Sequence, residues 1–319
     1  MLQLLGSFSV YSSKVIEAKK IINDCNQNER NILKTTGIFN ISKFSRKILI
    51  KDIYDVLLKK AFSEINIDPV GILVCTKTKD ESMPSLSSQI VFRNKLTNVD
   101  FCHDIDSGCT GFVDITRMAD LYLERNKRGH VLCFTGDISS RIVDYSEYSL
   151  ACVLGDLINL TVYEYIETDS KQLFSEFICP KYSLSIHQKE NDYVRMDGME
   201  VMSFVSKTVI SSLEKYLNNL LNLEKSIPRT LVLHQANQFI VNFINKKIKN
   251  KYKNINFGKF SMGNTGNSSS STIPFAISQY GQNNSLNRDL ILCGFGVGMK
   301  VSIGNIKVSK SALFYDLTL

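Results

Sequence analysis

Apolar and polar positions follow two alternating patterns along this chain. Short runs that are almost wholly apolar, such as 71–75 and 230–233, have the length and composition of strands buried on both faces of a sheet. Other stretches place apolar residues at helical spacing, as Ile53, Val56 and Leu57 do within 50–65. Strands that alternate with helices predict a layered α/β fold.

The alternation of strands and helices occurs twice. In the first half, the pattern predicts strands at 4–10, 71–75, 99–105 and 131–136, helices at 50–65, 85–96 and 112–126, and β-rich composition over 152–166. In the second half, it predicts helices at 201–223, 238–251 and 271–279, a strand at 230–233, and a closing hairpin of 289–295 with 299–306. The segment between them, 168–191, is polar and irregular. We therefore predict two comparable halves, 1–167 and 168–319.

The composition is that of an ordinary globular protein: 319 residues, 44% hydrophobic and 22% charged. No apolar stretch is long enough to span a bilayer, and the N-terminus lacks a signal-peptide pattern, so we expect no membrane association and a cytoplasmic location. Eight cysteines form no Cys-x-x-Cys pair and only four histidines are present, which favours reduced thiols and no metal site. The formal net charge of +7 fits an acidic partner or simply a solvated lysine-rich surface, and we expect no nucleic-acid partner.

Cys109 stands at a chemically favourable position. It lies within 106–112, between the predicted strand 99–105 and the helix that begins at 112. Unpaired N–H groups and the dipole at a helix N-terminus favour an anion, and the thiolate is the nucleophilic form of cysteine. A cysteine beside glycines also fits a structural role, as a small residue at a tight crossing. This stretch alone leaves both interpretations open.

Three further stretches carry residues of interest. His234 follows the predicted strand 230–233 and precedes a helix, where it fits either a cleft or a buried, satisfied position. Asn264 is bracketed by Gly263 and Gly266, as in a turn. The glycine-dense stretch 294–298 indicates a tight turn whose backbone amides approach another group closely.

Taken together, these stretches resemble the type III β-ketoacyl synthases of the thiolase superfamily. The resemblance rests on DSGCTGF (106–112), LVLHQAN (231–237), FSMGNTG (260–266) and CGFGVGM (293–299), with weaker agreement at 34–38, 83–85, 154–156 and 196–201. The motifs follow the order and spacing of the family over nearly the whole chain. The resemblance implies a five-layered αβαβα fold of two similar halves, and a homodimer.

The resemblance also implies a catalytic triad. Cys109 would accept the acyl group from a thioester, and His234 with Asn264 would hydrogen-bond the malonyl thioester carbonyl while carbon dioxide leaves. The backbone N–H groups of Cys109 and Gly296 would hold the oxyanion. Neutral donors suit decarboxylation and favour carbon–carbon bond formation, although His234 also fits the role of a base.

Several positions depart from the family. The chain has no tryptophan, and the segment 31–38 lacks the tryptophan and arginine that the family uses for coenzyme A. Tyr148 and Phe239 stand where the family has two further arginines, whose phosphate grip they cannot replace. We therefore expect the acyl group to arrive on acyl carrier protein or another thioester rather than on coenzyme A, with no tightly bound cofactor.

Other positions concern the substrate pocket and the docking surface. Leu157 brings bulk where the family has small residues, Asn237 closes the LVLHQAN motif, and the segment after Thr265 is longer than in the family. Met83 aligns with a residue that enters the partner subunit's acyl pocket, or serves as a core or turn residue. Lys246 and Lys247 match basic positions that bind acyl carrier protein, or simply complement a helix end.

The predicted function is acyl transfer to Cys109 followed by decarboxylative condensation with a malonyl-carrier extender, in a specialised fatty-acid or polyketide pathway. One alternative is an acyltransferase that passes the acyl group to an amine or hydroxyl without decarboxylation. Another is a non-catalytic partner subunit.

Overall fold

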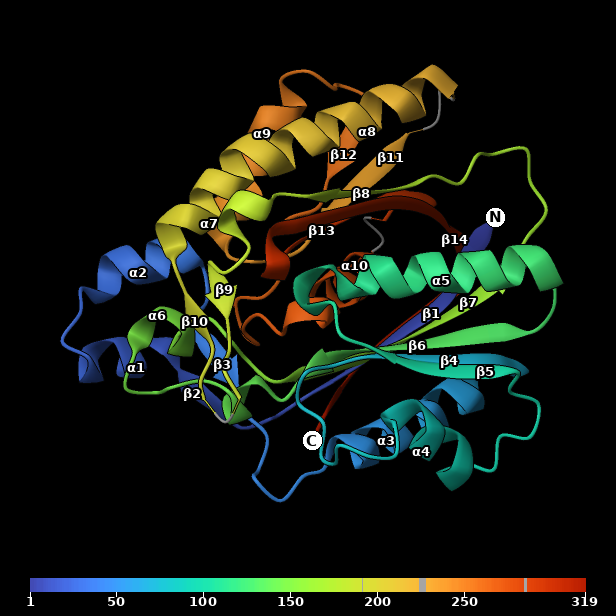
Figure 1. Cartoon of the computed structure of the whole chain (residues 1–319), viewed down its shortest axis with the longest axis horizontal. Helices are drawn as coiled ribbons and strands as arrows, with labels where there is room; N and C mark the ends of the chain where they lie inside the picture. Colours follow the sequence, from blue (N-terminus) through green and yellow to red (C-terminus); the bar gives the residue numbers. More distant parts are fainter. Residues whose placement is uncertain (191, 224–227, 284–285) are drawn as a thin grey trace.

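Ten of the described strands form one continuous set of pairings, and β2 with β3 and β9 with β10 form two small separate sheets. The computed structural model describes residues 1–190, 192–223, 228–283 and 286–319. Within them, a ten-stranded sheet runs in the order β12-β11-β13-β14-β1-β7-β6-β4-β5, and β8 pairs with β14 (Figure 1). The bounds of these strands are β1 (Leu2–Tyr11), β4 (Pro69–Cys75), β5 (Phe101–Ile105), β6 (His130–Asp137), β7 (Leu157–Tyr165), β8 (Phe174–Ile178), β11 (Arg229–Leu233), β12 (Ile255–Phe257), β13 (Asp289–Gly296) and β14 (Lys300–Thr318).

The long strand β14 connects two layers of this sheet. Its residues 300–307 pair antiparallel with β13, which confirms the predicted closing hairpin. From Lys307 to Thr318 it pairs parallel with β1, beyond the end of the prediction. The strands of the two halves are therefore joined through backbone hydrogen bonds as well as packing.

Helices cover both layers and fill the space between them. The outer helices are α3 (Ile50–Glu64) and α4 (Leu86–Arg93) on one side, and α8 (Ile210–Leu223) and α9 (Gln238–Lys249) on the other. The middle layer contains α5 (Gly111–Asn126) and α10 (Thr272–Gln282), whose apolar residues pack with strands of both halves (Figure 1). This arrangement confirms the predicted five-layered, thiolase-like αβαβα fold.

The sequence of β6 shows why the layers form. Leu132 and Phe134 belong to the core under α3 and α4, whereas Val131 and Cys133 belong to the core beneath α5. Successive side chains of a strand point to opposite faces, so a strand that is apolar at every position requires a helical layer on each side.

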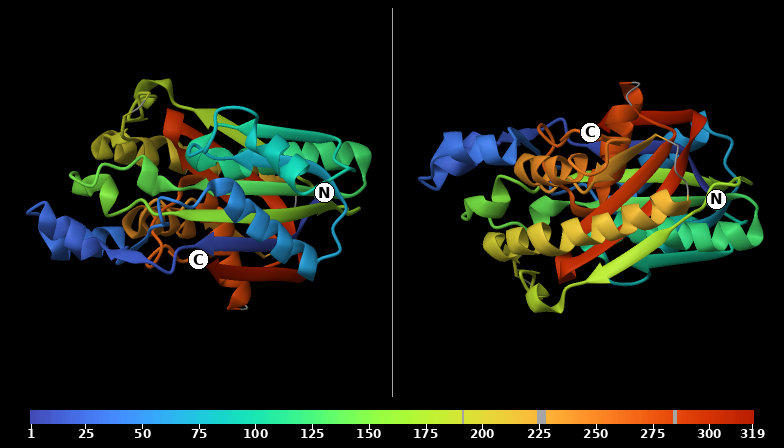
Figure 2. Two further views of the ribbon diagram at one scale, coloured as in Figure 1. Left: turned by 90° about the horizontal axis from the view of Figure 1, so that it is seen from below. Right: turned by 90° about the horizontal axis from the view of Figure 1, so that it is seen from above.

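Smaller elements gather at one end of the molecule. They are β2 (Val15–Glu17), α1 (Ala18–Asp24), α2 (Glu29–Thr36), β3 (Asn40–Ser42), α6 (Tyr148–Ala151), β9 (Ile186–His187), β10 (Arg195–Met196) and α7 (Gly198–Phe204). Figures 1 and 2 show α1 and α2 projecting at this end in every view. The predicted helix 201–223 is α7 and α8 joined by a π-helical turn, Val205–Val209.

Among the helices that the structure describes, none is both long and apolar enough to cross a membrane. The division into 1–167 and 168–319 stays a prediction, as does the cytoplasmic location.

Candidate active site

Cys109 lies at the N-terminus of the central helix α5, as predicted. Strand β5 ends at Ile105, a single 3₁₀ turn spans Gly108–Thr110, and α5 begins at Gly111. The tight entry depends on glycine, because a Cβ at Gly111 would lie 2.2 Å from the sulfur of Cys75. The local backbone thus positions Cys109 at the N-terminal end of α5, where the helix dipole favours an anion.

The turn between β13 and β14 packs directly against Cys109. Gly296 has a φ of +150°, and a Cβ there would lie 2.8 Å from the Cβ of Cys109 and 2.9 Å from its Sγ. A Cβ at Gly294 would lie 2.8 Å from the Cα of Thr110. The close backbone approach predicted for 294–298 is therefore confirmed. The oxyanion role of the Cys109 and Gly296 N–H groups stays a prediction.

The environment of Cys109 favours the neutral thiol at rest. Burial raises the pKa of the Cys109 thiol, while the hydroxyl of Ser269 and the backbone N–H of Val297 act to lower that pKa. Ser269 Oγ lies 3.7 Å from the sulfur and donates toward it. These donors are placed where negative charge develops on sulfur during attack.

His234 follows β11 directly and is only 2% exposed. Its Nδ1 lies 2.7 Å from the hydroxyl of Thr272, and its ring meets the edge of Phe295 at a centroid distance of 5.4 Å. Burial lowers the pKa of His234 to about 3. The imidazole is therefore neutral near pH 7, as a hydrogen-bond donor to a carbonyl requires.

The assignment of Asn264 is wrong, and Asn267 occupies the site instead. Asn264 is exposed, its side-chain oxygen accepts a hydrogen bond from Asn40 (3.2 Å), and it is not among the described residues that line the cavity around Cys109. Asn267 is 6% exposed and lines that cavity with Cys109 and His234. Its Nδ2 donates to the carbonyl of Ala236 (3.3 Å) and its Oδ1 accepts from the N–H of Ser269 (2.8 Å).

The sequence contained a signal for this correction. Gly263-Asn264 and Gly266-Asn267 are two Gly-Asn pairs three residues apart, and the tripeptide Gly-Asn-Thr drew the assignment to the first. The chain has extra residues ahead of Pro274 relative to the family. With Asn267 in the site, these extra residues precede Asn267 in the sequence. Counting back from Pro274, rather than forward from Gly263, would have identified Asn267.

A run of serines after Asn267 ties this segment to the first half of the chain. Ser268 Oγ accepts from the N–H of Asp137 (3.0 Å) and contacts the carbonyl of Leu157 (2.7 Å). Ser270 Oγ accepts from the N–H of Gly136 (2.9 Å) and donates to the carbonyl of Cys75 (3.2 Å). The run fixes Asn267 and Ser269 against the ends of β4, β6 and β7.

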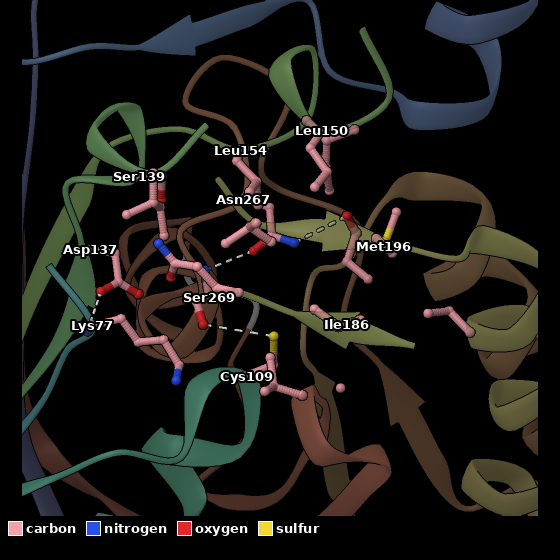
Figure 3. Close-up of a pocket in the computed structure, with 18 of the residues that line it drawn as sticks. Lys77, Cys109, Asp137, Ser139, Leu150, Leu154, Ile186, Met196, Asn267 and Ser269 are labelled. Atoms are coloured by element: carbon pink, nitrogen blue, oxygen red, sulfur yellow. Dashed lines mark hydrogen bonds between the residues drawn. The ribbon is translucent and has the colours of Figure 1, made fainter. Parts of the chain in front are cut away.

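The three site residues share a cavity of about 670 Å³. Figure 3 shows Lys77, Asp137 and Ser139 on one side of the Cys109 sulfur, and Ile186 and Met196 on the other. The polar part of the wall includes Thr76, Lys77, Lys79, Asp106, Asp137 and Ser139, together with His187, Gln188, Lys189 and Glu190. The apolar part includes Ile142, Leu150, Leu154, Ile186, Met196 and Phe204. Sequence reasoning identified none of the polar wall residues.

Of the other predicted substrate contacts, one lines the cavity and three lie outside its described lining. Asn237 lines the cavity, and its side chain also caps α9 by accepting from the N–H of Ile240 (2.9 Å). Leu157 is wholly buried in the core and Phe239 is half exposed on α9, so neither is among the described residues that line the cavity. Met83 also lies outside that lining and is 82% exposed. The prediction that Leu157 contacts substrate is therefore wrong, whereas a substrate contact at Phe239 stays a prediction.

Lys246 and Lys247 lie exposed in the last turns of α9. Lys246 borders a second hollow on the surface, between α9 and residues 255–260, together with Lys249 and Lys253. The ammonium of Lys247 lies 5.7 Å from the centre of the Phe243 ring. These positions leave both lysines open to a partner.

Comparisons with known proteins agree with this geometry. The family model of 3-oxoacyl-[acyl-carrier-protein (ACP)] synthase III matches residues 103–157, and the model of its C-terminal part matches 221–307. β-Ketoacyl-[acyl-carrier-protein] synthase III of Clostridium tetani is 27% identical over 283 residues, 79% of this chain and 81% of the relative.

Solved structures share the fold. The crystal structure of 3-oxoacyl-(acyl-carrier protein) synthase from Burkholderia xenovorans has a TM-score of 0.87 at 18% identity, covering 100% of this chain and 97% of that one. The priming β-ketosynthase from the R1128 polyketide biosynthetic pathway has a TM-score of 0.82 at 19% identity, covering 97% and 96%. The fold and site together define a thiolase-like protein. Within that class, the chain is similar to the type III β-ketoacyl synthases, whose family models match segments of both halves.

Proposed function

We propose that the protein transfers an acyl group from a thioester to Cys109 and then condenses it with a malonyl-carrier extender. The observation that carries this proposal is the meeting of Cys109, His234 and Asn267 in one cavity at the N-terminus of α5. A nucleophile at a helix end and two neutral donors from the other half of the chain fit a reaction with one covalent and one decarboxylative step.

In the first step, the sulfur of Cys109 bonds to the carbonyl carbon of the donor thioester and the carbon–sulfur bond of the donor breaks. The proton of the Cys109 thiol leaves with the departing thiol. Because burial raises the pKa of Cys109, the reaction depends on donors that stabilise the sulfur as it loses that proton, a role that fits Ser269 and the Val297 N–H.

In the second step, the malonyl carboxylate leaves as carbon dioxide and the resulting enolate attacks the acyl-cysteine carbonyl. The new carbon–carbon bond forms as the bond from carbon to the Cys109 sulfur breaks. Asn267 retains one Nδ2–H beyond the one that it donates to Ala236, and we assign this N–H to the thioester oxygen. His234 supplies the second donor when its proton is on Nε2.

Thr272 sets which nitrogen of His234 carries the proton. Its hydroxyl has a single proton and faces two acceptors, Nδ1 of His234 at 2.7 Å and the carbonyl of Ser269 at 3.1 Å. Donation to Nδ1 leaves the hydrogen of the neutral ring on Nε2, which suits decarboxylation. Donation to Ser269 leaves Nε2 as an acceptor, so that His234 is a base, which suits the second candidate function: acyl transfer to an amine or hydroxyl.

We further propose acyl carrier protein as the partner and thioesters as the substrates, without a tightly bound cofactor. Exposed Lys246 and Lys247 support an acidic partner on α9. The exposure of Met83 supports a homodimer in which this side chain meets the second subunit. A specialised fatty-acid or polyketide-type pathway fits the absence of tryptophan and of the arginines expected for coenzyme A.

The test is intact-mass measurement of the protein with carrier-bound and coenzyme A-bound acyl groups, followed by malonyl-carrier addition. We expect an acyl adduct that Cys109→Ser abolishes, faster formation from carrier-bound donors, and release of carbon dioxide. An adduct that moves to an amine or hydroxyl without carbon dioxide would support the acyltransferase. Failure of every donor to form an adduct would contradict catalysis and leave a non-catalytic partner subunit.

A further inference from the structure

The polar side of the cavity contains an ion pair that the proposed reaction does not use. Lys77 Nζ lies 2.6 Å from Oδ1 of Asp106, and both residues line the cavity that contains Cys109. Their side chains are 30% and 69% exposed, so the pair is reached by solvent and by any substrate in the cavity. An ion pair at the wall of a site for plain hydrocarbon chains would lose hydration without compensation.

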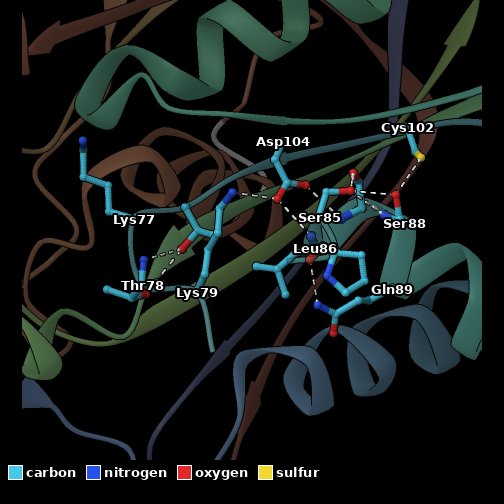
Figure 4. A network of polar contacts seen from close by, with 12 residues as sticks. Lys77, Thr78, Lys79, Ser85, Leu86, Ser88, Gln89, Cys102 and Asp104 are labelled. Atoms are coloured by element: carbon cyan, nitrogen blue, oxygen red, sulfur yellow. Dashed lines mark hydrogen bonds and ion pairs between the residues drawn. The ribbon is translucent and has the colours of Figure 1, made fainter. Parts of the chain in front are cut away.

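The backbone of Lys77 is fixed, and its side chain is directed away from a neighbouring network. The N–H of Lys77 donates to Oδ1 of Asp137 (2.6 Å), which also accepts from the hydroxyl of Thr76 (2.9 Å). Lys79 instead pairs with Asp104 at 2.8 Å, and that carboxylate accepts two N–H groups at the start of α4. Figure 4 shows Lys79 reaching Asp104 while Lys77 points elsewhere.

Lys77 acts at the same place as the nucleophile. Figure 3 shows its side chain beside Cys109, on the side opposite Ile186 and Met196. The positive charge of Lys77 also acts to lower the pKa of the Cys109 thiol, although the nearby carboxylate of Asp137 acts in the opposite direction. An acyl group on Cys109 that extends toward Lys77 therefore meets this ion pair.

We propose that Lys77 and Asp106 select an acyl group that carries a hydroxyl group. This inference rests on the proposed acyl transfer to Cys109. In the contacts between described residues, Asp106 takes one N–H of the Lys77 ammonium, which leaves two to donate, and the carboxylate of Asp106 retains acceptor capacity. A hydroxyl group both accepts and donates, so it satisfies both members of the pair.

Other acyl groups fit this wall less well. A terminal carboxylate accepts from Lys77 but meets the carboxylate of Asp106 at the same ion pair, where like charges repel. A terminal ammonium donates to Asp106 but is repelled by the ammonium of Lys77. An unsubstituted chain offers the ion pair no hydrogen bond in exchange for the water that it displaces.

The experiment measures acylation of Cys109 by N-acetylcysteamine thioesters of butyrate, 3-hydroxybutyrate, 4-hydroxybutyrate and succinate, using intact mass of the full chain. We expect at least one hydroxybutyrate to react about tenfold faster than butyrate, as one hydrogen bond to a charged group allows, and succinate to react slowest. The double variant Lys77→Met/Asp106→Ala, and separately Lys77→Met, should lose the preference for the hydroxyl while still forming an adduct with butyrate.

The matched control is Lys51→Met/Glu81→Ala. This ion pair also has a 2.6 Å separation but neither residue is among the described cavity residues, so the preference should persist. Equal rates for butyrate and both hydroxybutyrates in the wild-type protein, or a preference that survives in both Lys77 variants, would overturn the inference and leave acyl transfer standing. Absence of an adduct from every thioester, carrier-bound donors included, would overturn the proposed function and this inference with it.

Discussion

Variants of Asn267 distinguish the roles of its two side-chain hydrogen-bonding atoms, Nδ2 and Oδ1. In Asn267→Ala, loss of the Nδ2 donor should lower the rate of malonyl-carrier decarboxylation by about 10²–10³-fold, the effect of removing one preorganised donor to a developing oxyanion. Loss of Oδ1 also leaves the N–H of Ser269, now accepted at 2.8 Å, without its partner. The free energy of unfolding should therefore fall by roughly 1–3 kcal/mol.

Asn267→Asp distinguishes the two effects, because it retains an oxygen for the Ser269 N–H and removes the Nδ2 donor. Decarboxylation should be lost in this variant as in Asn267→Ala, while formation of acyl-Cys109 remains measurable by intact mass. The assay is carbon dioxide release from malonyl-carrier at saturating protein, with urea unfolding of each variant alongside.

Asn264→Ala is the matched control. This exposed side chain makes a 3.2 Å hydrogen bond with Asn40, so its removal should change stability by less than about 0.5 kcal/mol and decarboxylation by less than about twofold. Full decarboxylation activity in both Asn267 variants, combined with its loss in Asn264→Ala, would refute the reasoning from cavity geometry.

Three further outcomes follow from the structure. Because burial lowers the pKa of His234 from 6.5 to about 3, the rate of decarboxylation should show no step near pH 6.5. The buried neutral ring should contribute stability that is fully present above pH 6.5 and is lost as the pH falls toward 3. The His234→Gln variant should lose less stability over the same pH range. Lys246→Glu/Lys247→Glu should raise the KM for a carrier-bound donor about tenfold at low salt, with less effect at high salt, since an acidic carrier would be repelled. Ser270→Ala should lower the free energy of unfolding by about 1–3 kcal/mol in urea, because it removes the acceptor of the buried Gly136 N–H.

Each of these has a control of the same kind. His103→Gln changes an exposed histidine that is not among the described cavity residues and should keep the acid sensitivity of the wild type. Lys47→Glu/Lys59→Glu makes the same charge change on exposed positions at and near α3, on the opposite outer layer from α9. Ser311→Ala removes an exposed hydroxyl. A step in activity near pH 6.5 would contradict the argument that His234 is neutral. Equal KM changes in the two lysine double variants would contradict carrier docking on α9. Equal stability of the two serine variants would contradict the role of Ser270 as a buried acceptor.

The layered fold was predictable because its strands are buried on both faces. Such strands are apolar at every position, as β4 is from Pro69 to Cys75, and their pattern needs no knowledge of distant contacts. The elements between Val15 and Ser42 escaped prediction for the opposite reason. They are short and half exposed, and their apolar residues pack in a small cluster with Val143 and Cys152, far along the chain.

The site was predictable where chemistry coincides with a strand end. Cys109 and His234 come shortly after β5 and β11, where the chain leaves a strand of the sheet. Asn267 was missed because it stands in an irregular segment whose register is set by tertiary hydrogen bonds. Lys77 was missed because a lysine after a buried strand is usually solvated, and only the folded chain brings it beside Cys109.

The serine run also determines where this chain tolerates a change in length. The hydroxyls of Ser268, Ser270 and Ser271 are each matched to backbone groups of the first half, and that of Ser269 contacts the sulfur of Cys109. One inserted or deleted residue within 267–272 would therefore shift hydroxyls away from these partners. The glycine-rich stretch 263–266 is held mainly through its carbonyl groups, which accept from the N–H groups of Phe39 (2.7 Å) and Ser42 (3.0 Å), so its contacts depend less on which side chain stands at each position. For relatives of this protein, alignment should therefore be fixed at the serine run, and gaps should be placed before it.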